Sequence, residues 1–467
     1  MSSAAKSEPT RTEFAISEKE IRFAFGVFFF FLAAYLITWG GHYTSGDGAQ
    51  KIAWAKAMLS GASSGVSPSP NGIYSKYGIG HSLIAMPALA IASFLRSHTG
   101  IRSEAALYTL IFVFNGAILL ALIAYYLSHF YARRQVLWVV GVIGLATTWW
   151  PYTKLDFSEP LVTTLLFAGF VLMRFGRPMT GMLTAAFTIT IRPDAGILVA
   201  LLALWFLLGE PGRRNIIKIT VPVLPWIAVV AWSNYTRYHS IFDHGYANEG
   251  FTTPVLIGLE GILFSPGKSI FVFSPPLVLG FLGWRRFWRN RALRADAGLF
   301  LAIFSAELLT YAKWWDWSSD DAWGIRFMIP AVVIMCIPAV EVVERRARLA
   351  AGLALCGVII QLIPVLVGGL DYLLLVRNHE AKRTALYLSG LNRVDFEDIR
   401  FNPRYSQIAG SWILLRHMLH MPPRAGAPDA SANSGTPLYE TLPAAVWSEA
   451  AQWDFFWTRR TPPGRQP

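Results

Sequence analysis

The stretch that decides the fold is residues 39–87, which read W-G-G-H-Y-T-S-G-D-G-A-Q-K-I-A-W-A-K-A-M-L-S-G, a linker of small residues, then G-I-Y-S-K-Y-G-I-G-H-S-L-I-A-M-P. An apolar run over 21–38 ends at a pair of glycines, and Asp47 follows almost at once. The spacing after Asp47 predicts a short amphipathic helix, because Ile52, Ala55 and Leu59 share one side. Lys51 and Lys56 are placed on its other sides.

Asp47 has two interpretations at this point. An Asp near the start of a helix often satisfies free backbone N–H groups, and such a cap has no chemical role. A carboxylate just beyond a membrane helix, with Tyr74, Lys76 and Tyr77 in the same loop, is also typical of a reaction centre at the membrane surface.

Composition places the chain among integral membrane proteins. Of its 467 residues, 54% are hydrophobic and 15% are charged, whereas soluble domains carry about 25% charged residues. The net charge of +12 is explained by membrane topology, so no nucleic-acid partner is expected. Cys336 and Cys356 lie inside apolar runs and predict no disulfide framework. The first apolar segment lacks a small-residue cleavage site, which predicts an uncleaved span.

The hydropathy pattern predicts an all-α polytopic protein with about eleven transmembrane helices. The expected spans are 21–39, 105–127, 136–150, 161–173, 179–191, 195–208, 219–232, 269–284, 297–312, 327–343 and 349–370. Residues 82–95 are apolar but short and contain Pro87, so we expect them to lie in the membrane surface.

Charge orients these spans. Five basic turns fall on one side if the spans alternate, and that side is cytoplasmic by the positive-inside rule. The chain then divides into a cytoplasmic tail (1–20), a transmembrane catalytic domain (21–372) and an extracytoplasmic C-terminal region (373–467). Two long outer loops, 40–104 and 233–268, belong to the middle part, and the first carries amphipathic juxtamembrane helices.

Several outer loops carry further candidate residues. Asp156 and Glu159 stand at the mouth of a span, although Glu-Pro is also a routine helix start. Arg192 and Asp194 flank a proline and are either an ion pair at a helix break or part of a site. His244 lies in a loop whose His and Asp spacing is a poor metal signature.

Two more segments complete the candidate set. Lys268 follows Ser265-Pro266-Gly267 and is either a phosphate contact or an interfacial lysine whose stem lies along apolar surface. A tryptophan-rich loop contains Asp316 and precedes Arg326, and it is either an interfacial aromatic belt or a sugar platform.

The order of these elements resembles the GT-C superfamily of membrane glycosyltransferases, and more closely the branch with protein O-mannosyltransferases and the lipid A aminoarabinose transferase. The resemblance runs from the Asp47 loop through D-F-S-E-P and L-F-S-P-G-K-S-I-F-V-F-S-P-P to W-G-I-R-F-M-I-P. It implies a polyprenyl-phosphate-linked sugar donor, Asp47 as catalytic base and Lys76 as a contact to the donor phosphate. The chain departs from those families at Asp47-Gly48, where they often have two adjacent acids, and at Lys76-Tyr77-Gly78, where the aminoarabinose enzyme has Lys-Pro-Pro.

The expected reaction is transfer of a sugar to a hydroxyl of a lipid, glycan or protein, with inversion, at the outer face of a bacterial inner (plasma) membrane. Catalytic candidates are Asp47, Glu159 and Asp156, and substrate-binding candidates are Tyr74, Lys76, Tyr77, Arg192, His244, Lys268, Asp316 and Arg326. No cofactor is predicted, and a divalent cation is left open. The alternative is a multi-pass transporter or a flippase for lipid-linked sugars, because proline-broken segments occur near Arg192 and Pro275.

Overall fold

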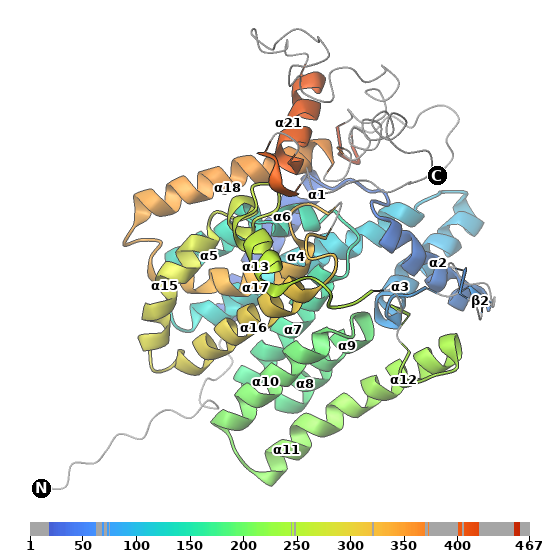
Figure 1. The fold of residues 1–467 in the computed structure, drawn as a ribbon, viewed down its shortest axis with the longest axis horizontal. Helices are drawn as coiled ribbons and strands as arrows, with labels where there is room; N and C mark the ends of the chain where they lie inside the picture. Colours follow the sequence, from blue (N-terminus) through green and yellow to red (C-terminus); the bar gives the residue numbers. More distant parts are fainter. Residues whose placement is uncertain are drawn as a thin grey trace, which may run out of the picture.

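A computed structural model describes residues 18–61, 68–69, 72–73, 75–243, 245–246, 249–319, 322–368, 372, 400–403, 406–419 and 453–457. These residues form an assembly of helices (Figure 1). The first half contains α1 (Glu18–Ile37), α2 (Gly46–Ser60), α3 (Ile79–Thr99), α4 (Glu104–Ser128), α5 (Arg133–Ala146), α6 (Trp149–Tyr152), α7 (Glu159–Arg174), α8 (Pro178–Ala186), α9 (Thr188–Ile191) and α10 (Ala195–Gly209).

The second half contains α11 (Arg213–Thr220), α12 (Leu224–Tyr238), α13 (Val255–Phe264), α14 (Ile270–Phe273), α15 (Leu277–Arg289), α16 (Arg294–Lys313), α17 (Ile329–Cys336), α18 (Ala347–Val367) and α21 (Gln407–Met418). Short 3-10 turns occupy Val221–Val223, Arg326–Met328 and Ile337–Glu341. The strands β1 (Pro68–Ser69) and β2 (Gly72–Ile73) pair as a small antiparallel hairpin.

Six helices of the described chain are long and apolar enough to cross a membrane, which identifies an integral membrane protein. They are Glu18–Ile37, Ile79–Thr99, Glu104–Ser128, Arg213–Tyr238, Arg294–Lys313 and Ala347–Val367. The predicted spans fall on helices, but 136–150, 179–191, 219–232, 269–284 and 327–343 are each divided into shorter pieces. The number of eleven spans therefore stays a prediction, whereas the all-α fold is confirmed.

Helices α4 and α7 lie in the interior of the helical assembly, and small residues let their neighbours approach. Where α7 crosses α8, Gly169 faces Gly181, and a Cβ on either would lie 2.6 Å from the carbonyl oxygen of the other. Close backbone approach at small residues is the usual way that membrane helices pack.

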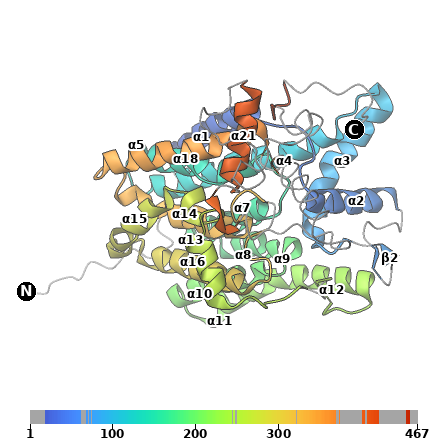
Figure 2. The same ribbon diagram turned by 45° about the horizontal axis from the view of Figure 1, so that its top comes forward.

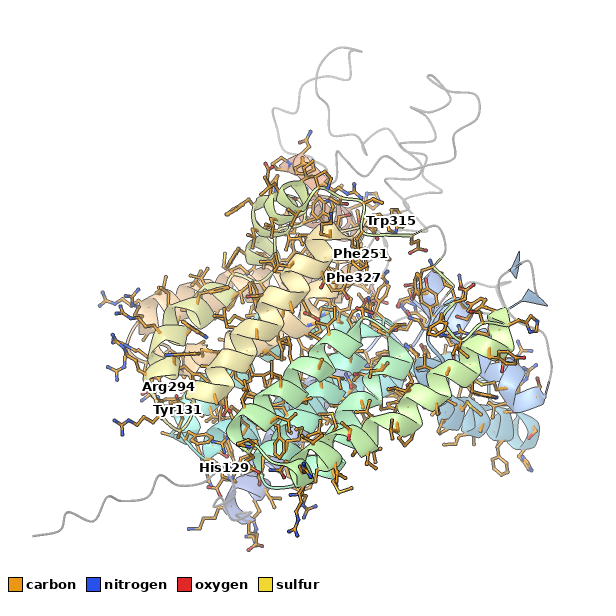
Figure 3. All side chains as sticks on the ribbon, turned by 60° about the horizontal axis from the view of Figure 1, so that its bottom comes forward. His129, Tyr131, Phe251, Arg294, Trp315 and Phe327 are labelled. Carbon is orange, nitrogen blue, oxygen red and sulfur yellow. The ribbon has the colours of Figure 1, made fainter. Side chains whose placement is uncertain are left out.

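The basic turns gather at one end of the helices. Arg174, at the end of α7, is buried and pairs with Asp296 in α16 (Nε–Oδ2 3.0 Å). Tyr131 donates to Glu341 (2.6 Å), which brings the turn before α5 to the turn before α18. Figure 3 shows Tyr131 and Arg294 toward this end, with Phe251, Trp315 and Phe327 toward the other. We refer to the two ends as the basic end and the site end.

Helix α3 is longer than the sequence predicted. The predicted surface segment 82–95 lies inside a 21-residue helix that contains Pro87. The helix begins earlier because His81 is buried, with its ring nitrogens bonded to Ser158 (3.1 Å) and Tyr108 (2.7 Å). His81, near the start of α3, contacts Tyr108 in the first turns of α4. The end of α3 is connected to the start of α4 by residues 100–103. Both ends of α3 are therefore tied to the first turns of α4. The placement of this segment in the membrane surface stays a prediction, since α3 is also long and apolar enough to cross a membrane.

The second long outer loop also contains unpredicted structure. Helix α13 lies within 233–268, a range that was expected to be a loop. It packs beside α16, and Thr253 just before it donates its backbone N–H to Lys313 (3.1 Å). Figure 2 shows α13 and α16 in the same layer, with α12 reaching toward α2 at the site end.

The described parts of the C-terminal region contact the site end. Gln407 of α21 donates to the carbonyl of Ala322 (2.5 Å) and accepts from the backbone N–H of Gly324 (2.7 Å). Residues 453–457 lie against residues 36–42. This region and the Asp47 loop therefore lie at the same end. Residues 1–17 of the predicted tail 1–20 lie outside the described residues, and residues 18–20 belong to α1.

Candidate active site

Asp47 is not the cap of its helix. The N-cap of α2 is Ser45, whose hydroxyl accepts from the backbone N–H of Gly48 (2.8 Å). The Asp47 carboxylate turns away from the helix N–H groups and binds two side chains from distant segments. Arg326 donates to Oδ2 (2.7 Å) and the Tyr77 hydroxyl donates to Oδ1 (2.5 Å). Ser45 therefore performs the capping that one interpretation gave to Asp47.

The environment of Asp47 holds it ionised. Burial alone would raise the pKa of the carboxyl, but Arg326, Lys51 and the hydrogen bond from Tyr77 outweigh burial and hold the pKa well below its usual range. Burial and the neighbouring carboxylate raise the pKa of Tyr77, so the phenol stays protonated and donates a hydrogen bond to Asp47. The resting site thus contains a charged acid bound to a fixed cation.

Asp156 approaches the backbone beside Asp47. Its buried carboxylate accepts from the hydroxyl of Thr44 (Oγ1–Oδ1 2.5 Å). A Cβ placed on Gly48 would lie 2.0 Å from the other oxygen, Oδ2. The glycine after Asp47 is therefore required by Asp156, which fills the space that a second adjacent acid would need. Oδ2 itself is buried without a hydrogen-bond partner in the described structure.

Acidic and basic side chains alternate in a row that starts at Asp47, and we call this row the charge ladder. Glu159 lies between two arginines, because Arg192 donates to Oε1 and Arg326 Nε is 3.7 Å from the same oxygen. Both guanidinium groups lie on the ring of Phe327, at 5.2 Å and 5.0 Å from its centroid. Glu159 keeps its second oxygen, Oε2, buried and unbonded among the described residues.

The far side of Arg192 completes the ladder. Its Nε lies 3.2 Å from Asp194 Oδ1, so the predicted ion pair at the helix break exists. Tyr311 of α16 accepts from Arg192 (3.1 Å) and donates to Asp194. The ion-pair interpretation is confirmed, and the pair connects directly to Glu159, whereas a role of Arg192 in substrate binding stays a prediction.

Lys76 stands at the exposed side of this cluster. Its ammonium pairs with Glu249 (2.5 Å) and lies over the rings of Tyr77 (5.5 Å) and Tyr246 (5.3 Å). About a third of the Lys76 side chain is exposed (35%), so a ligand reaching the cluster would meet it first.

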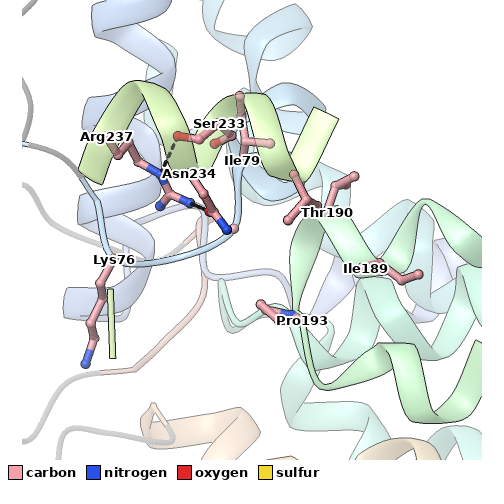
Figure 4. A pocket seen from close by; sticks show the side chains of 10 residues that line it. Lys76, Ile79, Ile189, Thr190, Pro193, Ser233, Asn234 and Arg237 are labelled. Atoms are coloured by element: carbon pink, nitrogen blue, oxygen red, sulfur yellow. Dashed lines mark hydrogen bonds between the residues drawn. The ribbon is translucent and has the colours of Figure 1, made fainter. Parts of the chain in front are cut away.

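Arg237 of α12 fixes the backbone that carries Lys76 and Tyr77. It donates to the carbonyls of Ser75 (2.8 Å) and Tyr77 (2.9 Å), and its guanidinium lies over Trp54 of α2. A cavity of about 10 Å³ beside it has room for roughly one water molecule. Figure 4 shows Arg237, Lys76 and Asn234 around this cavity.

Lys51 is the site residue that sequence reasoning missed. It follows Asp47 by one helical turn, is 2% exposed, and lies over the Tyr77 ring at 4.7 Å. Burial lowers the pKa of the ammonium, and Asp47 and Glu159 oppose that effect. Among the described residues its ammonium forms no ion pair or hydrogen bond, whereas its backbone carbonyl accepts from Ser82 (2.8 Å). The i, i+4 spacing from Asp47 could have indicated Lys51. The sequence instead predicted that Leu59 lies on the buried side of the helix and Lys51 does not, whereas Leu59 is 42% exposed and Lys51 is buried.

Two predicted residues lie outside the cluster. Lys268 is buried and donates to the carbonyls of Ala322 (2.8 Å) and Gly324 (3.2 Å), so it supports the turn that leads to Arg326. Asp316 is buried, accepts from Ser318 (3.3 Å) and lies 3.9 Å from Arg400. Tyr74 and His244 lie outside the described residues.

The structure thus brings together Asp47, Tyr77, Lys76, Asp156, Glu159, Arg192 and Arg326. In the described part of the chain, no group of three His, Cys, Asp or Glu side chains has an arrangement that could hold a metal ion.

Comparison with known proteins gives little further information. No family model matches the chain, and no curated protein matches it. Two solved structures of ArnT from Cupriavidus metallidurans align with it. The form bound to undecaprenyl phosphate has a TM-score of 0.48, 12% identity, and coverage of 87% of this chain and 72% of that one. The apo form has a TM-score of 0.46, 13% identity, and coverage of 86% and 70%. At these values the function has to be argued from the chain's own residues.

Proposed function

We propose that this protein is a membrane glycosyltransferase that takes a sugar from a polyprenyl-phosphate donor and passes it to a hydroxyl of a lipid, glycan or protein. The observation that carries the proposal is the pairing of the Asp47 carboxylate with Arg326, within a cluster of further cations at the site end of a membrane protein. A base for a hydroxyl and cations for a phosphate are the two requirements of this reaction.

The step is a single displacement with inversion. The acceptor oxygen attacks the anomeric carbon while the bond from that carbon to the phosphate oxygen breaks. The phosphate leaves with the bonding electron pair, and the hydroxyl proton passes to Asp47. A positioned carboxylate base accelerates such a step by about 10²–10⁴-fold.

The resting ion pair supplies a switch in basicity. While Arg326 is bound to Asp47, the low pKa makes the carboxylate a weak base. A donor phosphate near Arg326 competes for the guanidinium, because arginine binds phosphate and carboxylate in the same forked geometry. Transfer of Arg326 to the phosphate removes the main stabilisation of the Asp47 anion and raises its proton affinity when the donor is in place.

The remaining residues have distinct roles in this proposal. Lys51 supplies a buried cation behind Tyr77, and Lys76 supplies an outer one. Glu159 keeps Arg192 and Arg326 together. Asp156 is held against Gly48, beside Asp47, and its buried carboxylate fixes the backbone that carries the base. Lys268 and Asp316 are assigned no contact to substrate.

A transporter or flippase remains the alternative class. Transporters that couple to ions place ionisable groups within the spans, and Glu307 of α16 is such a group. However, Glu307 is buried and accepts from the backbone N–H of Ala331 (2.8 Å), which gives it a structural role.

The deciding experiment is lipid analysis of a strain lacking the gene. We expect one polyprenyl-phosphate-linked sugar to accumulate and one glycosylated product to disappear, and both should be reversed by the parental gene. Complementation with the Asp47→Asn variant should leave both changes in place. Accumulation of the lipid-linked sugar on the cytoplasmic leaflet alone would instead indicate a flippase.

A further inference from the structure

Residues 453–457, with the sequence W-D-F-F-W, form a short segment that we call the C-terminal strap. It returns to the end of α1, more than 400 residues earlier in the chain. The backbone N–H of Phe456 donates to Trp39 (2.7 Å), and that of Asp454 donates to Leu366 (2.8 Å). The Trp457 indole donates to the carbonyl of Leu36 (3.2 Å). The strap therefore joins the ends of α1 and α18.

The glycine pair after α1 is shaped to receive the strap. The Phe456 ring stacks on Trp39, with centroids 4.5 Å apart and planes inclined by 26°. A Cβ on Gly41 would lie 2.3 Å from the Phe456 ring, and the φ of Gly41 is +69°, which L side chains rarely adopt. Gly41 thus provides both the turn and the space for the ring. This fit explains the glycine at this position, which the proposed reaction does not explain.

Charge complementarity accompanies this fit. Asp454 is 3% exposed, and its two oxygens lie 2.5 Å from His42 Nε2 and 2.9 Å from Lys154 Nζ. Burial would raise the pKa of Asp454, but Lys154 and His42 outweigh burial and keep the carboxyl ionised. Lys154 is also 3% exposed, and removal of the carboxylate partner of a buried ammonium is strongly unfavourable.

The two residues that Asp454 binds lead directly into the candidate site. His42 precedes Asp47 by five positions, and Lys154 precedes Asp156 by two. Between them, the Thr44 hydroxyl donates to the Asp156 carboxylate (2.5 Å) and accepts from the backbone N–H of Asp156 (3.1 Å). The strap thus holds the two segments that carry the acids of the site.

We propose that residues 39–42 and Lys154 form a binding surface for residues 453–457 of the same chain, and that docking of the strap positions Asp47 beside Asp156. Asp454 and Phe456 are positioning residues, since they touch neither acid. The catalytic consequence rests on the proposed function, whereas the docking itself does not.

Docking is tested without any assay of activity. Phe456 is replaced by the photoreactive analogue p-benzoylphenylalanine, and the illuminated protein is digested and mapped. We expect cross-links to the peptide containing Trp39. Hydrogen exchange of the backbone amides of residues 40–52 should then be slow in the parent and at least tenfold faster in Asp454→Ala. Cross-links elsewhere, or exchange unchanged by Asp454→Ala, would overturn the proposal even if the protein is an active transferase.

The positioning role is tested by kinetics of the same variants. Asp454→Ala and Phe456→Ala should lower kcat by about tenfold or more, since small displacements of reacting groups cost that much, with KM for the donor little changed. Trp453→Ala is the matched control, because within the described chain that side chain forms no hydrogen bond or ring contact, whereas Phe456 stacks on Trp39. A purely structural strap would reduce the yield of folded protein and leave kcat of the folded fraction unchanged, which would contradict the positioning role. If the parent itself transfers no sugar, only the proposed function fails, and the cross-link still reports on docking.

Discussion

Asp47 and Arg326 are 279 positions apart in the sequence and form an ion pair of 2.7 Å. Their contact joins the first loop after α1 to the turn before α17, and it sets the charge state of the acid. The predictions that follow test what this pair and its neighbours do.

Asp47→Asn should separate base catalysis from structure. Because Ser45 caps α2, the amide should cost the helix little. An amide does not accept a proton at working pH, so kcat should fall by about 10²-fold or more while donor binding persists. Asp243→Asn, a change of an exposed acid in the second long loop, is the control. Near-parental turnover of the Asp47→Asn protein would move the base to Asp156 or Glu159.

Arg326→Gln should shift the acid limb of the kcat/KM profile. In the parent, burial raises the pKa of Asp47 but Arg326 and Lys51 outweigh it, so Asp47 stays ionised far into acid. Without Arg326 the pKa rises, and activity should be lost at a higher pH than in the parent. Arg192→Gln should leave the pH of this limb nearly unchanged, whatever its effect on the rate, because Arg192 is not among the groups that lower the pKa of Asp47. An unshifted limb in Arg326→Gln would show that Asp47 does not control it.

Lys51→Met should weaken binding of undecaprenyl phosphate. Lys51 is buried beside Tyr77, whereas Lys56 on the same helix is half-exposed and pairs with Glu104. Lys56→Met is therefore a matched control that removes one charge from the same helix. Titration of both purified proteins with undecaprenyl phosphate should show a Kd at least tenfold higher for Lys51→Met alone. Equal affinities would exclude Lys51 from the phosphate site.

Gly48→Ala should disturb the site, whereas Gly46→Ala should not. A Cβ on Gly48 would lie 2.0 Å from Asp156, but one on Gly46 meets nothing within 4 Å. Since overpacking typically costs about 1–3 kcal/mol, Gly48→Ala should lower the Tm and the rate, and Gly46→Ala should match or exceed the parental Tm. Thermal unfolding in detergent provides the measurement. Equal Tm values for the two variants would indicate that Asp156 moves aside freely.

Membrane sidedness is tested with single cysteines at Asn290 and Ala430. The native Cys336 and Cys356 are first replaced by Ala. An impermeant maleimide should label Ala430→Cys in intact cells and Asn290→Cys after disruption alone, because the basic turns are expected to be cytoplasmic. Labelling of both from the same side would overturn the predicted topology.

Much of this architecture was predictable because hydropathy and charge are local signals. The predicted spans fall on helices, and the basic turns at Arg174 and near Glu341 share one end. Helix α13 and the early start of α3 were missed, because His81 and the residues around Val255 depend on partners elsewhere in the chain. Hydropathy has no information about such partners.

The sequence predicted which residues belong to the candidate site better than it predicted how they are arranged. Asp47, Glu159, Arg192 and Arg326 were chosen individually from their places in loops, and the structure joins them into one ladder. Lys268 could not be distinguished from them by sequence, since only its contact with the Ala322 carbonyl shows that it supports the backbone. Lys51 was missed because its side of α2 becomes buried by Tyr77, which lies beyond an intervening linker.

The contact between the strap and residues 39–42 has a consequence for biosynthesis. The spans enter the membrane in order as the ribosome makes them, and Asp454 is translated after every helix of the described chain. Until it emerges, Lys154 and His42 lack the carboxylate that they bind in the finished chain. Under the proposed role of the strap, a nascent or prematurely terminated polypeptide that lacks residues 453–457 would hold its helices in the bilayer without an assembled site, so chemistry would begin only once that segment has been made.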